Sequence, residues 1–399
     1  MELRGVWMLL ALVAGTWATS SAAATSNASI ARKIDASKNV VQVRTIYNVR
    51  GAGSSYQFLI PEQLHARLAH MEVLVNGNYA AFRAGEQLEH FASYDVALGG
   101  KATAGGTVKV ETVAVYTDVL EPHPKEILQT EKQYMRYTDT AYVPSPYPTL
   151  SETTDVLLAE QSPREYHTGV TPWRVLQKTV AYGPYTDLTP EDTMAGGFSR
   201  VDHKAQMLGR GVSSGAAFRR LIAEIPGSAR DIYYRDNIGN ISTSPLLLVL
   251  DTRYPMYGGW KTAWYQGYNI PSQDGLSVNS ATGEYTLSME FGVPFEELWV
   301  EDLTIKVILP EGARDVRADV PFTVETSQTR RHTYLDSPLL GGRLVLIMRK
   351  ANVVAEHNIK FKVHYKFWRP LMLHEPLLLV GACLAFFLVA ILAPWGCSN

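Results

Sequence analysis

Histidines and glycines are the first residues in this sequence whose types could support chemistry. His65 and His70 lie five positions apart with no glutamate between them. A zinc-peptidase helix instead spaces two histidines four apart, with a glutamate after the first. The glycine-rich stretch 209–215 lacks the lysine that completes a phosphate-binding loop. We therefore expect surface histidines and an ordinary loop, with no metal site and no cofactor-binding residue.

Acidic pairs are the next candidates, because two carboxylates can share acid and base roles. The pairs lie at 296–297 and 301–302. Neighbouring residues on a strand point to opposite faces, so such pairs do not converge on one substrate. No Gly-x-Ser-x-Gly nucleophile motif occurs either. The sequence therefore predicts no catalytic residue.

Two asparagines begin the Asn-x-Ser pattern of a glycosylation acceptor, Asn27 and Asn240. Asn240 follows Gly239 in an expected turn between strands, where a glycan would face water. Asn27 lies close to the expected cleavage point of a leader, which weakens it as a candidate. Both are kept as N-glycosylation candidates.

The stretch 254–271 is rich in tyrosine and tryptophan around a Gly-Gly pair. Aromatic rings on a surface can stack on sugars, and such rings also serve as the core or interface of a sheet, with their polar tips hydrogen-bonded. We favour the core or interface role over a sugar site. The sequence alone leaves open whether this segment contacts glycan or peptide.

The elements that must position these residues are strands. Period-two alternation of β-branched and aromatic residues predicts antiparallel sheet with one solvated face. The predicted strands cover 40–47, 71–75, 108–116, 231–234, 260–268, 303–309, 344–348 and 359–367. Asn76-Gly77 is a strong hairpin signal between two of them. Helical periodicity is scarce in the interior, so we predict a mainly β protein.

The length of 399 residues fits two domains better than one. We predict two tandem antiparallel β-sandwich-like lumenal domains, 25–167 and 168–370, with the boundary in a proline-rich polar stretch. YQFLIP at 56–61 and FRRLIAEIP at 218–226 are similar. This similarity is explained equally well by an internal repeat and by chance.

Both ends of the chain predict contact with membranes. Residues 1–24 have the layout of a cleaved secretory signal peptide. Residues 371–393 predict one C-terminal transmembrane helix, built on an uncharged apolar run at 377–393 that matches a thin bilayer. Cations precede this run and none follows it, which opposes the positive-inside trend. We give the leader priority and expect a single-pass type I protein with a short cytosolic tail, 394–399.

The composition excludes several classes of protein. With 37 Lys+Arg against 39 Asp+Glu, the chain lacks the basic excess that nucleic acid binding requires. Both cysteines, Cys383 and Cys397, lie near the C-terminus, so the predicted lumenal part cannot contain a disulfide. A removable lipid-anchor signal is disfavoured, because no small-residue triplet and polar spacer precede the apolar run.

Five collinear blocks of sequence carry a resemblance to a known family. They are DIYYRDNIGNISTS at 231–244, GGWK at 258–261, GYNIP at 267–271, ILPEGA at 308–313 and MLHEPL at 372–377. In these blocks the chain resembles the ribophorin I family, whose members are subunits of the endoplasmic reticulum oligosaccharyltransferase. The blocks contain Gly239, Gly258, Gly259, Trp260, Lys261, Tyr268 and Pro271, which we take as structural positions of the family.

The resemblance implies a non-catalytic role in an endoplasmic reticulum membrane complex that transfers a preassembled glycan from dolichyl diphosphate to Asn-x-Ser/Thr. It implies other subunits as partners, including a multi-spanning catalytic subunit with a Trp-Trp-Asp motif. No Trp-Trp pair occurs here. Nascent polypeptide is a further expected partner, whereas no cofactor is expected. The alternatives are a cell-surface adhesion or receptor protein and a membrane-tethered hydrolase.

Overall fold

The computed structural model describes most of the chain between Thr25 and Gly396. Within 25–396, the residues not described are 52, 89, 100–105, 129–130, 132, 160–170, 196–200, 206–217, 240–247, 258–259, 296–297, 333–335 and 337–340. Several predictions therefore lie outside the described residues. These are the signal peptide 1–24, the loop 209–215, the acidic pair 296–297, the end of the tail, Asn240, Gly258 and Gly259.

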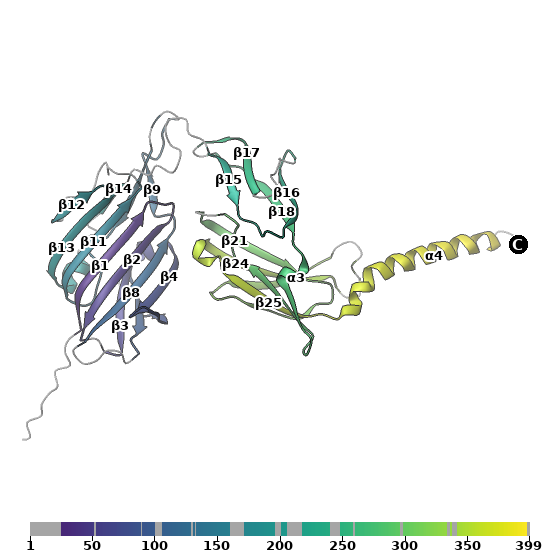
Figure 1. The fold of residues 1–399 in the computed structure, drawn as a ribbon, viewed down its shortest axis with the longest axis horizontal. Coiled ribbons are helices and arrows are strands. Elements are labelled where there is room, and N and C mark those ends of the chain that lie inside the picture. Colours follow the sequence, from purple (N-terminus) through teal and green to yellow (C-terminus); the bar gives the residue numbers. More distant parts are fainter. Residues whose placement is uncertain are drawn as a thin grey trace, which may run out of the picture.

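An eight-stranded sheet forms the first domain, which we define as residues 25–205 (Figure 1). In spatial order its strands are β12 (Trp173–Leu176), β13 (Thr179–Leu188), β11 (Thr149–Leu158), β1 (Ser26–Ala36), β2 (Val41–Arg50), β8 (Thr107–Tyr116), β4 (Leu68–Val75) and β5 (Asn78–Tyr79). β12 and β13 lie beyond residue 168, so the predicted boundary between 167 and 168 falls inside this sheet. The sheet crosses that boundary because β13 pairs with β11.

Two three-stranded sheets complete the first domain. One has the order β3 (Ser55–Pro61), β7 (Phe91–Ala97), β6 (Phe82–Ala84), and the other has the order β14 (Val201–Ala205), β10 (Tyr134–Asp139), β9 (Leu120–His123). Short helices α1 (Glu62–His65) and α2 (Pro190–Ala195) connect strands. One buried core joins side chains of all three sheets, including Ile34, Tyr56 and Tyr137.

Local sequence chemistry explains the strands of this domain. β2 alternates buried and exposed residues along its length, as period two requires. Asn76 and Gly77 have φ values of 51° and 83°, which is the left-handed pair that a tight hairpin turn needs. β1 differs from the purely antiparallel expectation, because it pairs with β11 in parallel and with β2 antiparallel. The described strand pairs are otherwise antiparallel.

The second domain, residues 272–366, is built from two facing sheets. One has the order β19 (Leu276–Asn279), β20 (Glu284–Glu290), β25 (Lys360–Lys366), β22 (Arg314–Asp319), and the other the order β21 (Val300–Ile308), β24 (Arg343–Val353), β23 (Glu325–Arg331). Their shared core includes Val307, Met348 and Phe361. The short helices α3 (Ser272–Gly275) and η1 (Ala355–His357) flank these strands. The predicted mainly β architecture is confirmed.

A ribbon segment, residues 218–271, lies between the two domains along the chain. It holds two separate two-stranded sheets, β15 (Phe218–Ala223) with β17 (Leu248–Met256), and β16 (Arg230–Asp236) with β18 (Trp264–Asn269). Its buried cluster contains only Ala223 and Tyr234 among the described residues. A bridge from Ala223 to Phe295 joins the segment to the second domain.

A histidine pair marks a contact between the first and second domains. The ring of His70 on β4 lies 5.4 Å from the ring of His357 on η1, edge to face. His357 is buried, and this burial, with Lys350 and His70 nearby, lowers its pKa to about 4. A neutral imidazole therefore packs at this contact at neutral pH.

The C-terminal helix α4 (His374–Gly396) follows the short helix η2 (Arg369–Leu373) and extends away from the β domains (Figure 1). It begins three residues after the predicted start at 371. Its described side chains, from Pro376 to Ile391, are exposed. Taken over the described residues, no helix combines the length and the apolar composition that crossing a membrane requires.

Candidate functional site: an exposed aromatic surface

Strand alternation in β16 and β18 divides their aromatic residues between two faces. Tyr234 and Trp264 point inward, where Tyr234 is buried and Trp264 packs edge-on against Phe295 with the ring centroids 6.4 Å apart. The neighbouring residues Tyr233 and Tyr265 point outward, because successive residues on a strand face opposite sides. They are 43% and 53% exposed.

The outward face of this ribbon is organised by contacts among its own side chains. The rings of Tyr233 and Tyr265 meet edge to face, with centroids 6.2 Å apart. The guanidinium of Arg235 lies over the Tyr233 ring, 5.4 Å from its centroid. Tyr233 also lies across Gly267, in the space that a side chain at 267 would fill. These contacts hold two large rings in place while their outer surfaces stay open to solvent.

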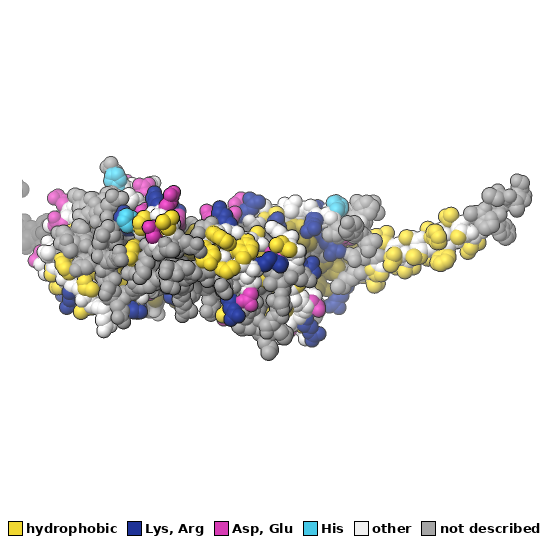
Figure 2. All heavy atoms as spheres, turned by 90° about the horizontal axis from the view of Figure 1, so that it is seen from above, with side chains coloured by type: hydrophobic (Ala, Val, Ile, Leu, Met, Phe, Trp, Pro, Cys, Tyr) yellow, Lys and Arg dark blue, Asp and Glu magenta, His cyan; other side chains and the backbone are white. Residues whose placement is uncertain are grey.

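A second exposed aromatic group lies at the end of β17 and just beyond it. Trp260 is 54% exposed and packs against Tyr254 and Tyr257, with centroid distances of 5.8 Å and 5.4 Å. The Trp260 N–H donates a backbone hydrogen bond to the Tyr257 carbonyl. We call Tyr233, Tyr254, Tyr257, Trp260 and Tyr265 the aromatic surface. In Figure 2, hydrophobic side chains gather over the middle of the molecule, on the side where the ribbons lie in Figure 1.

Asp236 ties the two ribbons together behind this surface. The Arg253 guanidinium from β17 donates two hydrogen bonds to its carboxylate, at 2.6 Å and 2.9 Å. The same carboxylate accepts the N–H groups of Ile238 and Gly239. The Arg253 hydrogen bonds lower the pKa of Asp236 well below its ordinary value. Gly239 has a φ of 151°, a region that favours glycine, which explains its place in this turn.

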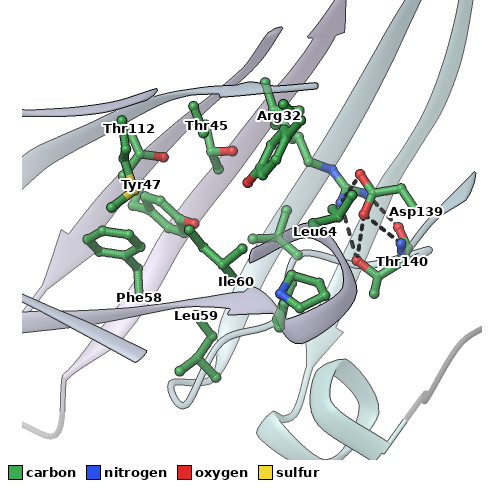
Figure 3. Close-up of a pocket in the computed structure, with 17 residues that line it drawn as sticks. Arg32, Thr45, Tyr47, Phe58, Leu59, Ile60, Leu64, Thr112, Asp139 and Thr140 are labelled. Carbon is green, nitrogen blue, oxygen red and sulfur yellow. Dashed lines mark hydrogen bonds and ion pairs between the residues drawn. The ribbon is translucent and has the colours of Figure 1, made fainter. Parts of the chain in front are cut away.

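A cavity of about 40 Å³ lies inside the first domain (Figure 3). Arg32, Tyr47, Asp139 and Thr140 are among the residues that line it. Its size suits a few water molecules. A larger cleft of about 320 Å³ adjoins it and shares Asp139 and Thr140 in its lining. The 40 Å³ cavity is thus small, and Arg32, Asp139 and Thr140 make one side of it polar.

Arg32 is the centre of the polar network beside this cavity. It is buried, and it forms an ion pair with Asp139 at 3.5 Å. Its guanidinium donates to the hydroxyl of Thr154 at 3.1 Å and to the carbonyls of Thr140 and Ala141 at 2.9 Å and 3.2 Å. These bonds connect β1 to β11 and to the segment after β10. The network therefore stabilises the domain, since a buried charge is tolerated only with such partners.

Glu152 is a second buried charge-bearing residue in this region. One carboxylate oxygen accepts the Val143 N–H at 2.8 Å, and the other has no hydrogen-bond partner. Burial raises the pKa of Glu152 to about 7, while Arg32 opposes that shift. Glu152 lines neither the cavity nor the cleft. It has no route to a substrate there, so we assign it no catalytic role.

Asn27 occupies a position unlike that of a glycan acceptor. The side chain is fully buried, and its amide nitrogen donates to the hydroxyls of Ser145 and Thr149 at 2.9 Å and 3.1 Å. Its carbonyl oxygen accepts the Tyr56 hydroxyl at 2.9 Å. A glycan on this nitrogen is incompatible with the folded domain. The sequence motif gave no sign of this burial.

The other residues singled out by sequence lie in different places. Trp260 belongs to the aromatic surface, and Lys261 follows it as an exposed residue. Tyr268 lies on β18, and Pro271 caps the start of α3. His65 on α1 lies 2.8 Å from the Tyr94 hydroxyl and is exposed, as expected. His70 on β4 is half-buried against His357, so the expectation of a surface residue was wrong there. The described part of the chain contains no cluster of three or more potential metal ligands.

Sequence analysis missed the buried network around Arg32. One signal was available, because Arg32 lies two positions from both Ile30 and Ile34, on the buried face of β1. A charged residue on an apolar strand face requires a partner. The partner, Asp139, is 107 residues away in sequence, and no local pattern identifies it.

The chain matches a known protein family over most of its length. The Ribophorin I family model matches residues 25–194 and 192–394, which together cover nearly the whole chain. Dolichyl-diphosphooligosaccharide–protein glycosyltransferase subunit 1B of Arabidopsis thaliana is 36% identical over 71% of this chain and 70% of its own length. The chain belongs to the ribophorin I family. The two matched segments meet near residue 193, inside the first domain and well after the predicted boundary.

Two further relatives match more of the chain at lower identity. Subunit 1A of Arabidopsis thaliana is 29% identical over 96% of this chain and 72% of its own length. Subunit 1 of Caenorhabditis elegans is 30% identical over 91% of this chain and 71% of its own length. Among solved structures, yeast LTA4 hydrolase covers 42% of this chain at 12% identity, with a TM-score of 0.29.

Proposed function

We propose that this ribophorin I family member is a non-catalytic subunit of the endoplasmic reticulum oligosaccharyltransferase. In this role it supports the transfer of a preassembled glycan from dolichyl diphosphate to Asn-x-Ser/Thr. The observation that carries the proposal is the family match over both halves of the chain. The relatives that share it are named as subunit 1 of the dolichyl-diphosphooligosaccharide–protein glycosyltransferase.

The aromatic surface is the part of the chain that we assign to partner binding. Interfaces of protein complexes are enriched in tyrosine, tryptophan and arginine. Tyrosine and tryptophan supply large contact area at low entropic cost. The surface holds such residues in fixed positions, with Arg235 packed on Tyr233. We propose that it docks another subunit, with the multi-spanning catalytic subunit as the first candidate, or guides nascent polypeptide.

The C-terminal helix is the part that we assign to the membrane. The uncharged run 377–393 is apolar throughout, and α4 includes all of it. About 20 apolar residues span a bilayer, and the 17-residue run in the sequence approaches this length in a thin membrane. The described residues alone contain no helix long and apolar enough for a span, so this assignment rests on the sequence. We propose a single-pass type I arrangement in which the leader directs the β domains into the lumen. The remaining tail then faces the cytosol.

Affinity purification of the tagged chain from mild detergent tests the assignment. The expected result is recovery of the other oligosaccharyltransferase subunits with the wild-type chain. The double variant Trp260→Ala/Tyr254→Ala should reduce that recovery at least about tenfold, as loss of central aromatic anchors does. Tyr79→Ala is the matched control, because Tyr79 is also a large ring and is 77% exposed on the first domain.

The outcomes separate the two parts of the proposal. Recovery of no oligosaccharyltransferase component with the wild-type chain contradicts the subunit role. Normal recovery with both the double variant and the control contradicts only the role of the aromatic surface.

A further inference from the structure

The junction between the second domain and α4 is packed against the domain. After β25 ends, the ring of Phe367 meets that of Tyr285 edge to face, 6.1 Å between centroids. The Arg369 side chain donates from Nε to the Tyr285 hydroxyl at 3.0 Å. Tyr285 in turn stacks on Tyr365 within the sheet. Tyr285 of β20 thus contacts the residues on both sides of Trp368, Phe367 and Arg369.

A glycine turn holds the next part of the junction. Gly312 has a φ of 84°, and a Cβ at this position would overlap with Cδ1 of Leu371. Leu371 therefore lies directly on the turn that joins β21 to β22. The Leu371 N–H also donates to the Trp368 carbonyl at 3.0 Å. Together these contacts fix η2 on the end of the second domain.

Two large apolar side chains of this junction point away from the domain. Trp368 is 67% exposed and Leu373 is 59% exposed, although Arg369 and Leu371 between them contact the domain. Two polar residues at the start of α4, His374 and Glu375, are all that separates Leu373 from the exposed apolar side chains that begin at Pro376. Trp side chains concentrate at the headgroup level of bilayers, because the indole is apolar with one polar N–H. Arg369 beside them can keep its charged group at the same level.

We propose that Trp368 and Leu373 insert into the lumenal interface of the phospholipid bilayer, where headgroups meet acyl chains. The second domain then sits directly on the lipid, and the packed joint sets its orientation. This inference rests on the proposed membrane-spanning role of α4. The two side chains contact the interfacial layer as a whole, which combines polar headgroups with apolar acyl chains. They do not bind one particular headgroup. The position of Trp368 and Leu373 within a few residues of the apolar run of α4 favours lipid over a protein partner.

Quenching of tryptophan fluorescence by brominated lipids tests the proposal. The full chain is reconstituted into phosphatidylcholine vesicles with bromine on acyl carbons near the headgroup. The emission of Trp368 is the emission of the wild-type chain minus that of the Trp368→Phe variant. This difference should fall by about twofold or more in brominated vesicles. The emission of Trp260, obtained in the same way from Trp260→Phe, should not change. Bromine near the bilayer centre should quench Trp368 less.

Carbonate extraction of the same vesicles separates the possible failures. If the chain resists extraction and the Trp368 emission is unaffected by bromine, the inference is overturned while the membrane span stands. If carbonate releases the chain, α4 does not span and both proposals fail.

Two glycine variants test whether the joint positions Trp368. Gly312→Ala and Gly283→Ala both place alanine at a positive φ, yet only Gly312 has a side chain against it. Gly312→Ala should therefore weaken the quenching of Trp368, and Gly283→Ala should not. Equal quenching in the two variants would overturn the claim that the joint fixes this residue.

Discussion

The first domain and the ribbon segment use aromatic residues in opposite ways. In the first domain Tyr47, Tyr56 and Tyr137 are buried in one core that joins three sheets. In the ribbon segment Tyr233 and Tyr265 lie on a two-stranded sheet and remain about half exposed. A two-stranded ribbon is only marginally stable alone. The comparison indicates that the first domain is stabilised from within, whereas the ribbon segment leaves its rings open to solvent.

The largest expected effect comes from breaking the buried ion pair of the first domain. Arg32→Ala leaves Asp139 buried without its cation, so the first domain should lose about 3–5 kcal/mol of unfolding free energy. Hydrogen exchange measured by mass spectrometry should show faster exchange in β1 and β11 and unchanged exchange in β16 and β18. Arg83→Ala is the control, because Arg83 is exposed on β6. Similar exchange in both variants would contradict the stabilising role of Arg32.

A smaller effect follows from the titration of Glu152. Its pKa is about 7 in the folded domain against 4.5 ordinarily. Between these values the unfolded chain loses the proton while the folded domain keeps it. Stability is therefore fully present below pH 4.5 and falls as the pH rises through 7, by roughly 1–3 kcal/mol. Hydrogen exchange of the first domain at pH 5 and pH 8, corrected for the intrinsic rates, measures this change.

Glu152→Gln provides the control for that pH dependence, because the amide does not titrate. The variant should lose most of the difference in stability between pH 5 and pH 8. A first domain whose pH dependence is the same in the wild type and in Glu152→Gln would show that another group is responsible. The ribbon segment serves as an internal reference in both chains.

The smallest expected effect on stability is that of removing an outward ring. Tyr265→Ala should change the unfolding free energy of the ribbon segment by no more than about 0.5 kcal/mol, as exposed substitutions do. It should still reduce recovery of the other subunits. Trp264→Ala, one residue away and facing inward, should destabilise the ribbon by about 2 kcal/mol or more. Equal destabilisation by the two variants would remove the contrast between the two regions.

Local patterns in the sequence predicted the local structure well. The alternating runs at 108–116 and 359–367 correspond to β8 and β25, and Asn76-Gly77 forms the expected turn. Pairings between distant strands could not be predicted in this way. The predicted domain boundary lay too early because β13 returns to pair with β11, and no periodicity encodes that return.

The candidate site was predicted only in part. The aromatic character of 254–271 singled out a segment in which Tyr254, Trp260 and Tyr265 are exposed, but alternation alone did not say which rings these would be. That depends on Phe295, which packs on Trp264 from outside the segment. The Asn27 sequon shows the same limit, since its burial depends on Ser145 and Thr149, more than a hundred residues further along the chain.

The central position of β1 determines when the first domain can close during synthesis. β1 is made first, but its parallel neighbour β11 pairs Thr149 with Asn27, 122 residues later. At about 5–20 residues per second, translation needs roughly 6–25 s to supply that strand. In the proposed lumenal arrangement the amide of Asn27 is accessible throughout this interval, and a sugar attached then would keep the sheet from closing. For the domain to fold, this asparagine must therefore remain unmodified until β11 has been synthesised.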